Sequence, residues 1–384
     1  MLADFNLSKS GKKKSMIRLK KKSLFIVTAG IFWSFLISCS PINLKPYYTG
    51  FFEYYDDPES SFFSFVVKND IIPVMRLIEE NIVPVNATDP YGQTAVMMAV
   101  QKGHLGMTEY LIQQQADLNL ADENGFTPLM AAIQEGHMRL ERLLVNKGAE
   151  INTKDFYGNF PLQIAITNTQ TEFAVFLLEQ GADPDMQDGD GNSPLMIAVS
   201  YGSKVLVDHL LERKCNLRVA NAAGETALHV ALRYQYKDIA KQLIENGADV
   251  NRKDESGATP LLLAVDSYAV DLIRPILDKG ADPDIRNHMG ENALIRAFIN
   301  GYMDIIPILL EKKPDLDVQD QKGFTLLMNA AYDGHIDIVT ALIEKGADQS
   351  VRSLEGKTAL DYARERRYQN IVEFLENAAK RVSS

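Results

Sequence analysis

Residues 122–154 read DENGFTPLMAAIQEGHMRLERLLVNKGAEINTK, and this 33-residue stretch decides the fold. It opens with Asp122, and Gly125 follows three residues later. This pair is typical of a tight turn, because a carboxylate can bond nearby backbone N–H groups and glycine accepts a positive φ. Thr127 and Pro128 then predict a helix start, since the hydroxyl can cap the helix and proline suits its first turn.

The second half of the stretch predicts a second helix. Gly136 and His137 turn the chain, and an apolar pair follows in each unit, such as Leu177 and Leu178 one unit later. A glycine then ends the helix, as Gly247 does further along, because glycine is favoured just past a helix C-terminus. Each unit is therefore expected to contain a turn, a helix, a second turn and a second helix.

The pattern recurs every 33 residues without insertion. The units begin at Asp89, Asp122, Asp155, Asp188, Asn221, Asp254, Asn287, Asp320 and Ser353. The fourth position is always glycine, and the eleventh is always alanine. The alanines are Ala99, Ala132, Ala165, Ala198, Ala231, Ala264, Ala297, Ala330 and Ala363. An invariant small residue lets two helices approach closely, so the chain is expected to stack its units into one continuous domain.

The pattern resembles the ankyrin repeat in its 33-residue period, its pair of helices in each unit and its Thr-Pro-Leu helix start. The resemblance implies an all-α repeat solenoid of about nine ankyrin repeats plus a degenerate N-terminal cap, with helix-turn-helix units joined by β-turn or hairpin fingers. The eight full repeats are 89–121, 122–154, 155–187, 188–220, 221–253, 254–286, 287–319 and 320–352. A C-terminal capping repeat follows at 353–384, and its charged residues supply a polar outer face.

Residues 56–88 fit the repeat frame weakly. Glu59 and Val66 stand where the fourth-position glycine and the eleventh-position alanine are expected. We interpret this segment as a degenerate N-terminal capping repeat that covers the first full unit. The covering side chains are Phe62, Phe63 and Phe65.

Two prolines depart from the pattern inside second helices. Pro275 and Pro307 each remove a backbone hydrogen bond and are expected to kink their helices. Either the irregularity is tolerated locally, or the solenoid bends around residues 254–319.

Residues 1–38 have the features of a secretory signal peptide, and Met16 is an alternative start. A basic cluster precedes an apolar run of 14 residues, from Leu24 to Ile37, which is shorter than the roughly 20 residues of a membrane-spanning helix. The run ends in Leu36-Ile37-Ser38-Cys39, which resembles a bacterial lipobox. This implies cleavage before Cys39, acylation of that cysteine and membrane attachment through acyl chains. An uncleaved N-terminal anchor is the alternative.

The leader predicts a lipoprotein of the bacterial cell envelope. Ser40, rather than an aspartate, follows the cysteine, which favours the outer membrane in the sorting pattern of such lipoproteins. Whether the body faces the periplasm or the outside stays open. Residues 39–55 are expected to tether the folded body to the lipid surface.

Charge excludes one class of partner. The net charge is −11, but without residues 1–38 the chain has 32 bases against 50 acids, a net of −18. Because a body with this negative charge would repel a phosphate backbone, no nucleic-acid partner is expected.

No catalytic, metal or cofactor site is expected either. The histidines of the Gly-His steps occupy structural positions of the repeat, and Cys215 reads as a small buried residue. Gly189-Asp190-Gly191 resembles part of a calcium loop but falls on the ordinary turn. Because the repeats fill nearly all of the mature chain, we expect a protein that is not an enzyme.

Surface positions that the fold does not need are candidates for binding. In the ankyrin family, partners usually dock on the turn tips and on the exposed face of the first helices. Aromatic residues and arginine, which are enriched in interface hot spots, stand there. The candidates are Tyr91, Phe126, Phe156, Tyr157, Tyr201, Arg233, Tyr234, Phe324 and Tyr332, with Met289 at a further tip.

The resulting hypothesis is a non-catalytic scaffold that binds one or more proteins, as a monomer anchored to the envelope. An acidic structural spacer of the envelope is one alternative. An accessory or regulator of an extracytoplasmic enzyme is the other.

Overall fold

The computed structural model describes residues 57–382, and the leader, Cys39 and the tether lie outside them. The described residues form helices joined by turns, with one isolated β-bridge between Thr88 and Thr94. The predicted all-α repeat solenoid is confirmed. In this part of the chain, no helix combines the length and apolar character that crossing a membrane would require.

Every unit contributes two helices. The first helices are α2 (Pro58–Val67), α4 (Ala95–Gln101), α6 (Pro128–Glu135), α8 (Pro161–Thr167), α10 (Pro194–Ser200), α12 (Ala227–Arg233), α14 (Pro260–Asp266), α16 (Ala293–Ile299), α18 (Leu326–Asp333) and α20 (Ala359–Glu365). The second helices are α3 (Ile71–Glu79), α5 (Leu105–Gln113), α7 (Met138–Asn146), α9 (Thr171–Glu179), α11 (Lys204–Glu212), α13 (Lys237–Glu245), α15 (Val270–Asp278), α17 (Ile305–Leu310), α19 (Ile336–Glu344) and α21 (Gln369–Val382).

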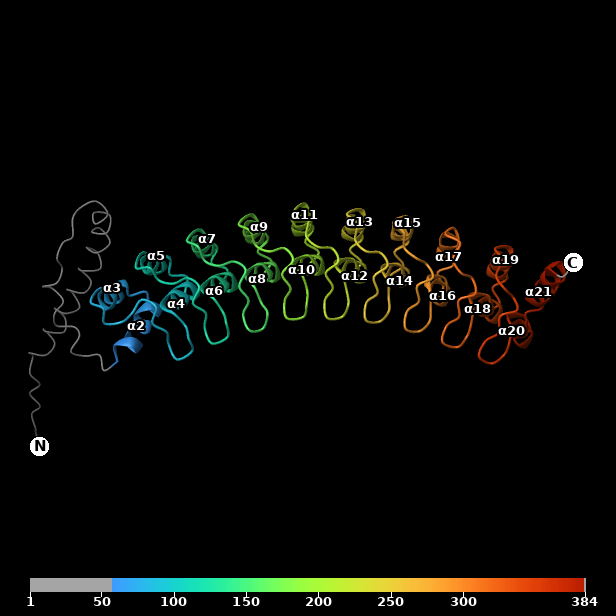
Figure 1. The fold of residues 1–384 in the computed structure, drawn as a ribbon, viewed down its shortest axis with the longest axis horizontal. Helices are drawn as coiled ribbons and strands as arrows, with labels where there is room; N and C mark the ends of the chain where they lie inside the picture. Colours follow the sequence, from blue (N-terminus) through green and yellow to red (C-terminus); the bar gives the residue numbers. More distant parts are fainter. Residues whose placement is uncertain (1–56, 383–384) are drawn as a thin grey trace, which may run out of the picture. The chain divides into compact units, whose positions relative to one another are not determined.

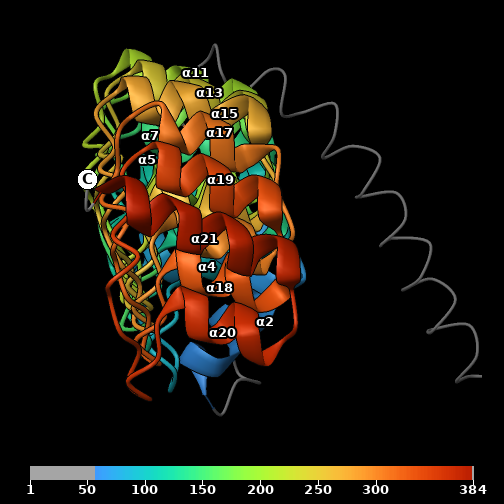
Figure 2. The same cartoon turned by 90° about the vertical axis from the view of Figure 1, so that its right-hand side faces the viewer.

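Units stack side by side in one row. Each first helix packs against the second helix of its own unit and against the first helix of the next, as α6 does with α7 and α8. First helices and fingers follow one side of the row, and second helices follow the other (Figure 1). Seen along the row, the fingers gather on one side of the helices (Figure 2). Each unit thus presents a finger and a first helix to the same side.

Helix starts follow the sequence. The hydroxyls of Thr94, Thr127, Ser193, Thr259 and Thr325 accept the N–H of the third helical residue, which leaves one fewer terminal donor unpaired. In α16 the side chain of Asn292 does the same. At α8, Phe160 offers no oxygen, and its own N–H instead donates to Oε1 of Gln163 at 3.3 Å.

The core runs between the helices of successive units. All nine eleventh-position alanines are fully buried, which explains their constancy, because a larger side chain there would push neighbouring units apart. The mid-unit turn needs a positive φ, which glycine usually supplies. Where glycine is missing, Thr169, Gln235 and Tyr268 adopt φ values of 58°, 59° and 51°. The repeat therefore imposes its backbone even on residues that resist it.

The N-terminal cap corrects the register expected from the sequence. Helix α3 begins at Ile71 and α5 at Leu105, a spacing of 34 residues, whereas α7 begins at Met138, 33 residues after α5. The loop after α3 thus holds one extra residue. As a consequence, Phe65 rather than Val66 stands at the alanine position of the cap. A 33-residue frame could not detect this, because the extra residue falls in a loop.

The three cap phenylalanines differ in burial. Phe62 is fully buried, and α2 packs against α4 of the first full unit. Phe63 and Phe65 are half-buried. The cap therefore adds apolar surface to the end of the row mainly through Phe62.

The two internal prolines have different local effects. Helix α15 continues through Pro275, and the N–H of Lys279 still reaches the carbonyl of Pro275 at 3.2 Å. Helix α17 has six residues instead of nine and begins two residues late. Pro307 therefore falls in its first turn, where the missing N–H has no intrahelical partner. In Figure 1 the row continues through both helices in line with their neighbours.

Candidate functional site

The fingers form the first part of the candidate surface. In the eight fingers that begin with Asp or Asn, a carboxylate or amide oxygen of that residue accepts backbone N–H groups two and four residues later. Asp155 does so from Tyr157 at 2.9 Å and from Asn159 at 2.7 Å. These bonds fix the turn without using the side chains at its second and third positions. Those two positions point outward and are free to vary.

Backbone hydrogen bonds also join neighbouring fingers. The N–H at the second position donates to the third-position carbonyl of the preceding finger, as from Glu123 to Tyr91 at 3.1 Å and from Phe156 to Asn124 at 2.9 Å. At the first full unit the second position is Pro90, which has no N–H to donate. The tips are therefore joined in a row that starts at a proline and, within residues 57–382, is interrupted once, between Tyr157 and Gly189, where this bond is not formed.

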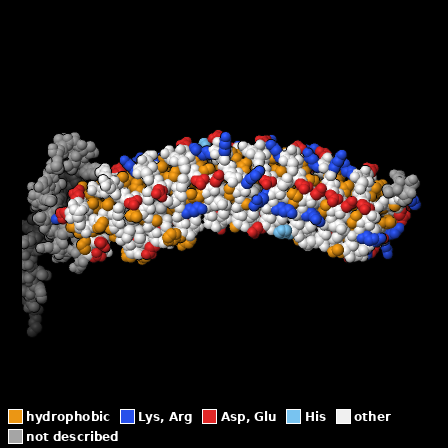
Figure 3. Space-filling model, viewed as in Figure 1, with side chains coloured by type: hydrophobic (Ala, Val, Ile, Leu, Met, Phe, Trp, Pro, Cys, Tyr) orange, Lys and Arg blue, Asp and Glu red, His pale blue; other side chains and the backbone are white. Residues whose placement is uncertain are grey.

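Three predicted tip aromatics are highly exposed. Tyr91, Phe156 and Tyr157 have exposed fractions of 69%, 79% and 71%. Phe156 and Tyr157 lie beside each other on one finger, and Tyr91 lies two fingers away. Figure 3 shows apolar side chains along the finger edge near the N-terminal end of the row. A large ring held outside the core by a fixed turn loses little freedom when it is covered by another surface.

Two other predicted tip residues are not free. Phe126 and Phe324 occupy the fifth position, where the backbone pairs with the first residue of the finger, and both side chains are half-buried. The ring of Phe324 lies 4.7 Å from that of Tyr362 and 6.4 Å from that of Tyr332, measured between centroids. The expectation of an exposed tip is wrong for both, because fifth-position side chains turn back toward the helices.

Some of the predicted residues of the first helices are exposed, and others already contact side chains within the protein. Tyr201 and Tyr234 cap the ends of α10 and α12 and are half exposed. Arg233 bridges the carboxylates of Glu225 and Asp254, so its charge is already used within the protein. Tyr332 is partly exposed, and the guanidinium of Arg366 lies 4.5 Å from its ring centroid. Tyr201 and Tyr234 therefore remain the accessible aromatics here.

Some exposed residues escaped the sequence analysis. Leu354, at the second position of the last finger, is 80% exposed, and its position in the repeat could have identified it. Tyr268 packs on Tyr302, with ring centroids 4.6 Å apart, and donates to Asp304 at 2.7 Å. Tyr268 stands where most units have the turn glycine, so its position in the sequence marks it only as a turn residue and does not reveal its contact with Tyr302.

The histidines serve the fold. Nε2 of His104 and of His137 lies 3.0 Å and 3.4 Å from carbonyls of the preceding unit, those of Val67 and Gln101. His229 is fully buried and bonds Thr226 and the carbonyl of Arg252, and burial lowers its pKa. Each imidazole therefore has a structural partner.

Among residues 57–382, no group of three or more His, Cys, Asp or Glu side chains has the arrangement of a metal site. Cys215 is buried with its thiol free, and burial raises its pKa to about 12. At that pKa the thiol stays protonated and unreactive at neutral pH.

Comparison with known proteins identifies the repeat. A family model described as ankyrin repeats (3 copies) matches residues 63–155, 162–254, 252–320 and 304–383. No curated protein matches the chain.

Proposed function

The chain belongs to the ankyrin-repeat family, and from this premise we propose that it is a non-catalytic scaffold that binds another protein through its N-terminal fingers. Ankyrin repeats generally mediate binding to proteins, and stacked repeats offer extended surfaces for it. The observation that carries the proposal is the pair Phe156 and Tyr157. Both rings are exposed by more than 70% on a turn whose backbone N–H groups, from Asp155 to Asn159, are all hydrogen-bonded.

The surface beside this pair also suits a partner. The next two fingers carry Gly189, Ala222 and Ala223 at exposed tip positions. These residues project little, so a partner backbone can lie close to the row while its side chains contact the two rings. Tyr201 and Tyr234 stand on the first helices of the same two units. Tyrosine is among the residue types that are enriched in interface hot spots.

The test is affinity capture from native membranes with the full chain, read by mass spectrometry. Phe156→Asp combined with Tyr157→Asp should abolish recovery of the partner, while helical content and melting stay unchanged. Leu354→Asp is the matched control, because Leu354 is equally exposed at a second tip position but lies on the last finger. Identical captured proteins from all three chains would reject the aromatic-tip proposal and favour the acidic spacer.

We also propose that the scaffold is a lipoprotein of the bacterial envelope, attached through Cys39 and directed to the outer membrane. The support is the order of basic cluster, 14-residue apolar run and Leu-Ile-Ser-Cys. Cys39→Ala should block acyl labelling and release the protein from membranes. Persistent membrane association of that variant would favour an uncleaved anchor instead.

A further inference from the structure

Three departures from the repeat's own pattern meet at one junction, between the units that begin at Asp122 and Asp155. The first is Glu141 on α7, at the twentieth position of its unit, where it is only 1% exposed. Every other full or capping unit from residue 89 onward places a buried, uncharged residue there. Those residues are Thr108, Ala174, Val207, Ala240, Ile273, Ile306, Val339 and Val372. Glu141 therefore places a carboxyl group at a buried position that is uncharged in all the other units.

The other two departures lie in the turn that leads into α9. Thr169 replaces the mid-unit glycine at φ 58°. Gln170 replaces the histidine that several units carry at the next position, and its Nε2 donates to the carbonyl of Ile133 at 2.9 Å. The same Nε2 lies 3.3 Å from Oε1 of Glu141. Oε1 of Gln170 is buried and has no hydrogen-bond partner among the described residues.

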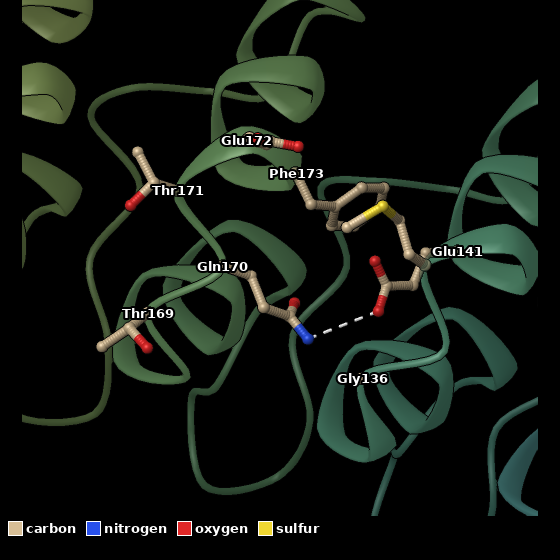
Figure 4. A pocket seen from close by; sticks show the side chains of 8 residues that line it. Gly136, Glu141, Thr169, Gln170, Thr171, Glu172 and Phe173 are labelled. Atoms are coloured by element: carbon tan, nitrogen blue, oxygen red, sulfur yellow. Dashed lines mark hydrogen bonds between the residues drawn. The ribbon is translucent and has the colours of Figure 1, made fainter.

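These side chains line a hollow of about 370 Å³. Gly136, Met138, Thr171, Glu172 and Phe173 complete its lining. Figure 4 shows the Glu141 carboxyl and the Gln170 amide pointing toward each other below the ring of Phe173. Met138 is half exposed at the rim, so the hollow opens to the surface past an apolar side chain.

The charge in this hollow is not balanced by the protein. Arg142 follows Glu141 in the chain, but its guanidinium lies over the ring of Phe176, 4.6 Å from the centroid. Glu172, on α9, adds a second carboxylate to the lining. Burial raises the pKa of Glu141 to about 7, and the Gln170 amide and the nearby Arg142 charge lower it only in part.

We infer that this hollow binds an organic cation, namely a protonated amine or a guanidinium group, between the carboxylate of Glu141 and the amide oxygen of Gln170. The lining includes the carboxyl groups of Glu141 and Glu172 and the unpartnered Oε1 of Gln170, all of which can accept hydrogen bonds, so a ligand rich in N–H donors satisfies them. An anion would meet two carboxylates. The apolar rim at Met138 suits an alkyl stem such as that of lysine or arginine. This site lies where the second helices begin, apart from the finger tips.

The test is isothermal titration of the full chain in detergent micelles with Nα-acetyl-lysine methylamide. Binding needs an ionised Glu141, so the measured affinity should be roughly tenfold higher at pH 8 than at pH 6. The same compound acetylated on Nε has no charge and should not bind. Absence of binding by the charged probe at pH 8 would overturn the inference.

Two variants localise the binding. Glu141→Val introduces a residue that three other units carry at this position, so it should fold and lose binding at every pH. Glu179→Gln removes an exposed carboxylate from α9, the other helix that lines the hollow, and should bind as the parent does, which excludes general attraction to an acidic protein. Equal affinity of parent and Glu141→Val would also reject the site.

A further pair of probes separates the two sources of such a cation. A side chain of a bound protein predicts tighter binding of the lysine derivative, whereas a free small amine predicts tighter binding of putrescine. Either ranking supports the cation site, and failure of both probes rejects it. The finger-tip variants should leave this binding unchanged, so the two proposals can fail separately.

Discussion

The two halves of the row use the same backbone for different purposes. From Tyr91 to Tyr201 the exposed rings Tyr91, Phe156, Tyr157 and Tyr201 stand on the tips and first-helix ends. The thirteenth positions of these units are the uncharged Gln101, Gln134, Thr167 and Ser200. From Glu225 onward, Arg and Lys side chains bridge carboxylates of the same or neighbouring units. Arg296 bonds Asp266 and Glu291, and Lys357 bonds Glu355 and Glu365.

The difference shows which positions the fold leaves free. Turn glycines and helix-facing alanines are the same in both halves, so stacking does not decide what stands beside them. In the C-terminal half several free positions join units through ion pairs, as Arg296 does with Asp266, whereas in the N-terminal half Tyr91, Phe156 and Tyr157 face outward. Residues that contribute to neither stacking nor cross-linking are the best candidates for recognition.

The largest expected effect concerns the buried acid of the N-terminal half. The pKa of Glu141 in the folded chain, about 7, lies above its ordinary value of 4.5. The stability linked to its protonation is therefore present below pH 4.5 and is lost as the pH rises through 7. Relative to Glu141→Val, the parent should lose up to about 3 kcal/mol of local stability by pH 8. Hydrogen exchange of α7 and α9 at pH 5 and pH 8 measures this.

The same experiment contains its own comparison. Helices α15 and α17 belong to the half whose acids are paired, so their exchange should differ little between parent and variant at either pH. The pKa of His229 is lowered, so this histidine reduces the stability of the fold when the pH falls below its ordinary pKa of 6.5. The effect is the same in both chains and cancels in the comparison. A pH-independent difference between parent and variant would contradict the expected ionisation of Glu141.

The second effect concerns the finger next to the aromatic pair. A Cβ added to Gly189 would lie 2.4 Å from the carbonyl oxygen of Tyr157, which is closer than any real contact. Gly189→Ala should therefore displace that finger and cost about 2 kcal/mol locally, with weaker binding of the partner. Gly106→Ala is the matched control, because Gly106, like Gly189, has no positive φ and a Cβ there would meet no atom within 4 Å. Equal melting curves for the two variants would show that close approach is not what matters at Gly189.

A third effect has the opposite sign. Thr169 is β-branched and sits at φ 58°, a conformation that glycine adopts without strain. Thr169→Gly should stabilise the junction by about 1 kcal/mol, measured by thermal unfolding. Gln235→Gly should give a smaller gain, because glutamine is not branched at Cβ. A loss of stability in Thr169→Gly would mean that the threonine makes contacts worth more than its backbone strain.

The smallest effect belongs to the ion pairs of the C-terminal half. Arg296→Met should cost about 1 kcal/mol or less, because partly exposed ion pairs contribute little. The cost should shrink further in 1 M salt, which screens charges. Chemical unfolding at low and high salt checks both points. A salt-independent loss would indicate that the alkyl stem of Arg296, rather than its charge, stabilises α16.

The fold was predictable because its determinants are local and repeated. A turn glycine, a capping hydroxyl and a small helix residue each act within one unit, so their spacing in the sequence reports them directly. The cap register was missed because Phe65 and Val66 are both apolar, and an extra loop residue leaves no periodic trace.

The candidate site was less predictable because burial depends on neighbouring units. Phe324 looks like a tip residue in its own unit, but Tyr362 of the next unit covers one side of it. Glu141 reads as an ordinary helix-surface acid, since its neighbours Arg139 and Arg142 are charged as well. Only the packing of α7 against the turn at Gln170 shows that this acid is enclosed.

Pro90 has a consequence for growth of the row by self-assembly. Most fingers donate to their predecessor, so two such molecules placed end to end could continue the row of bonds. Repetition of that contact would produce an open filament, because a head-to-tail interface does not close on itself. Pro90 offers no N–H to the last finger of another molecule, where Glu355 occupies the third position. Because Pro90 lacks this N–H, the row of finger hydrogen bonds does not continue from one molecule into the next, which disfavours head-to-tail filaments.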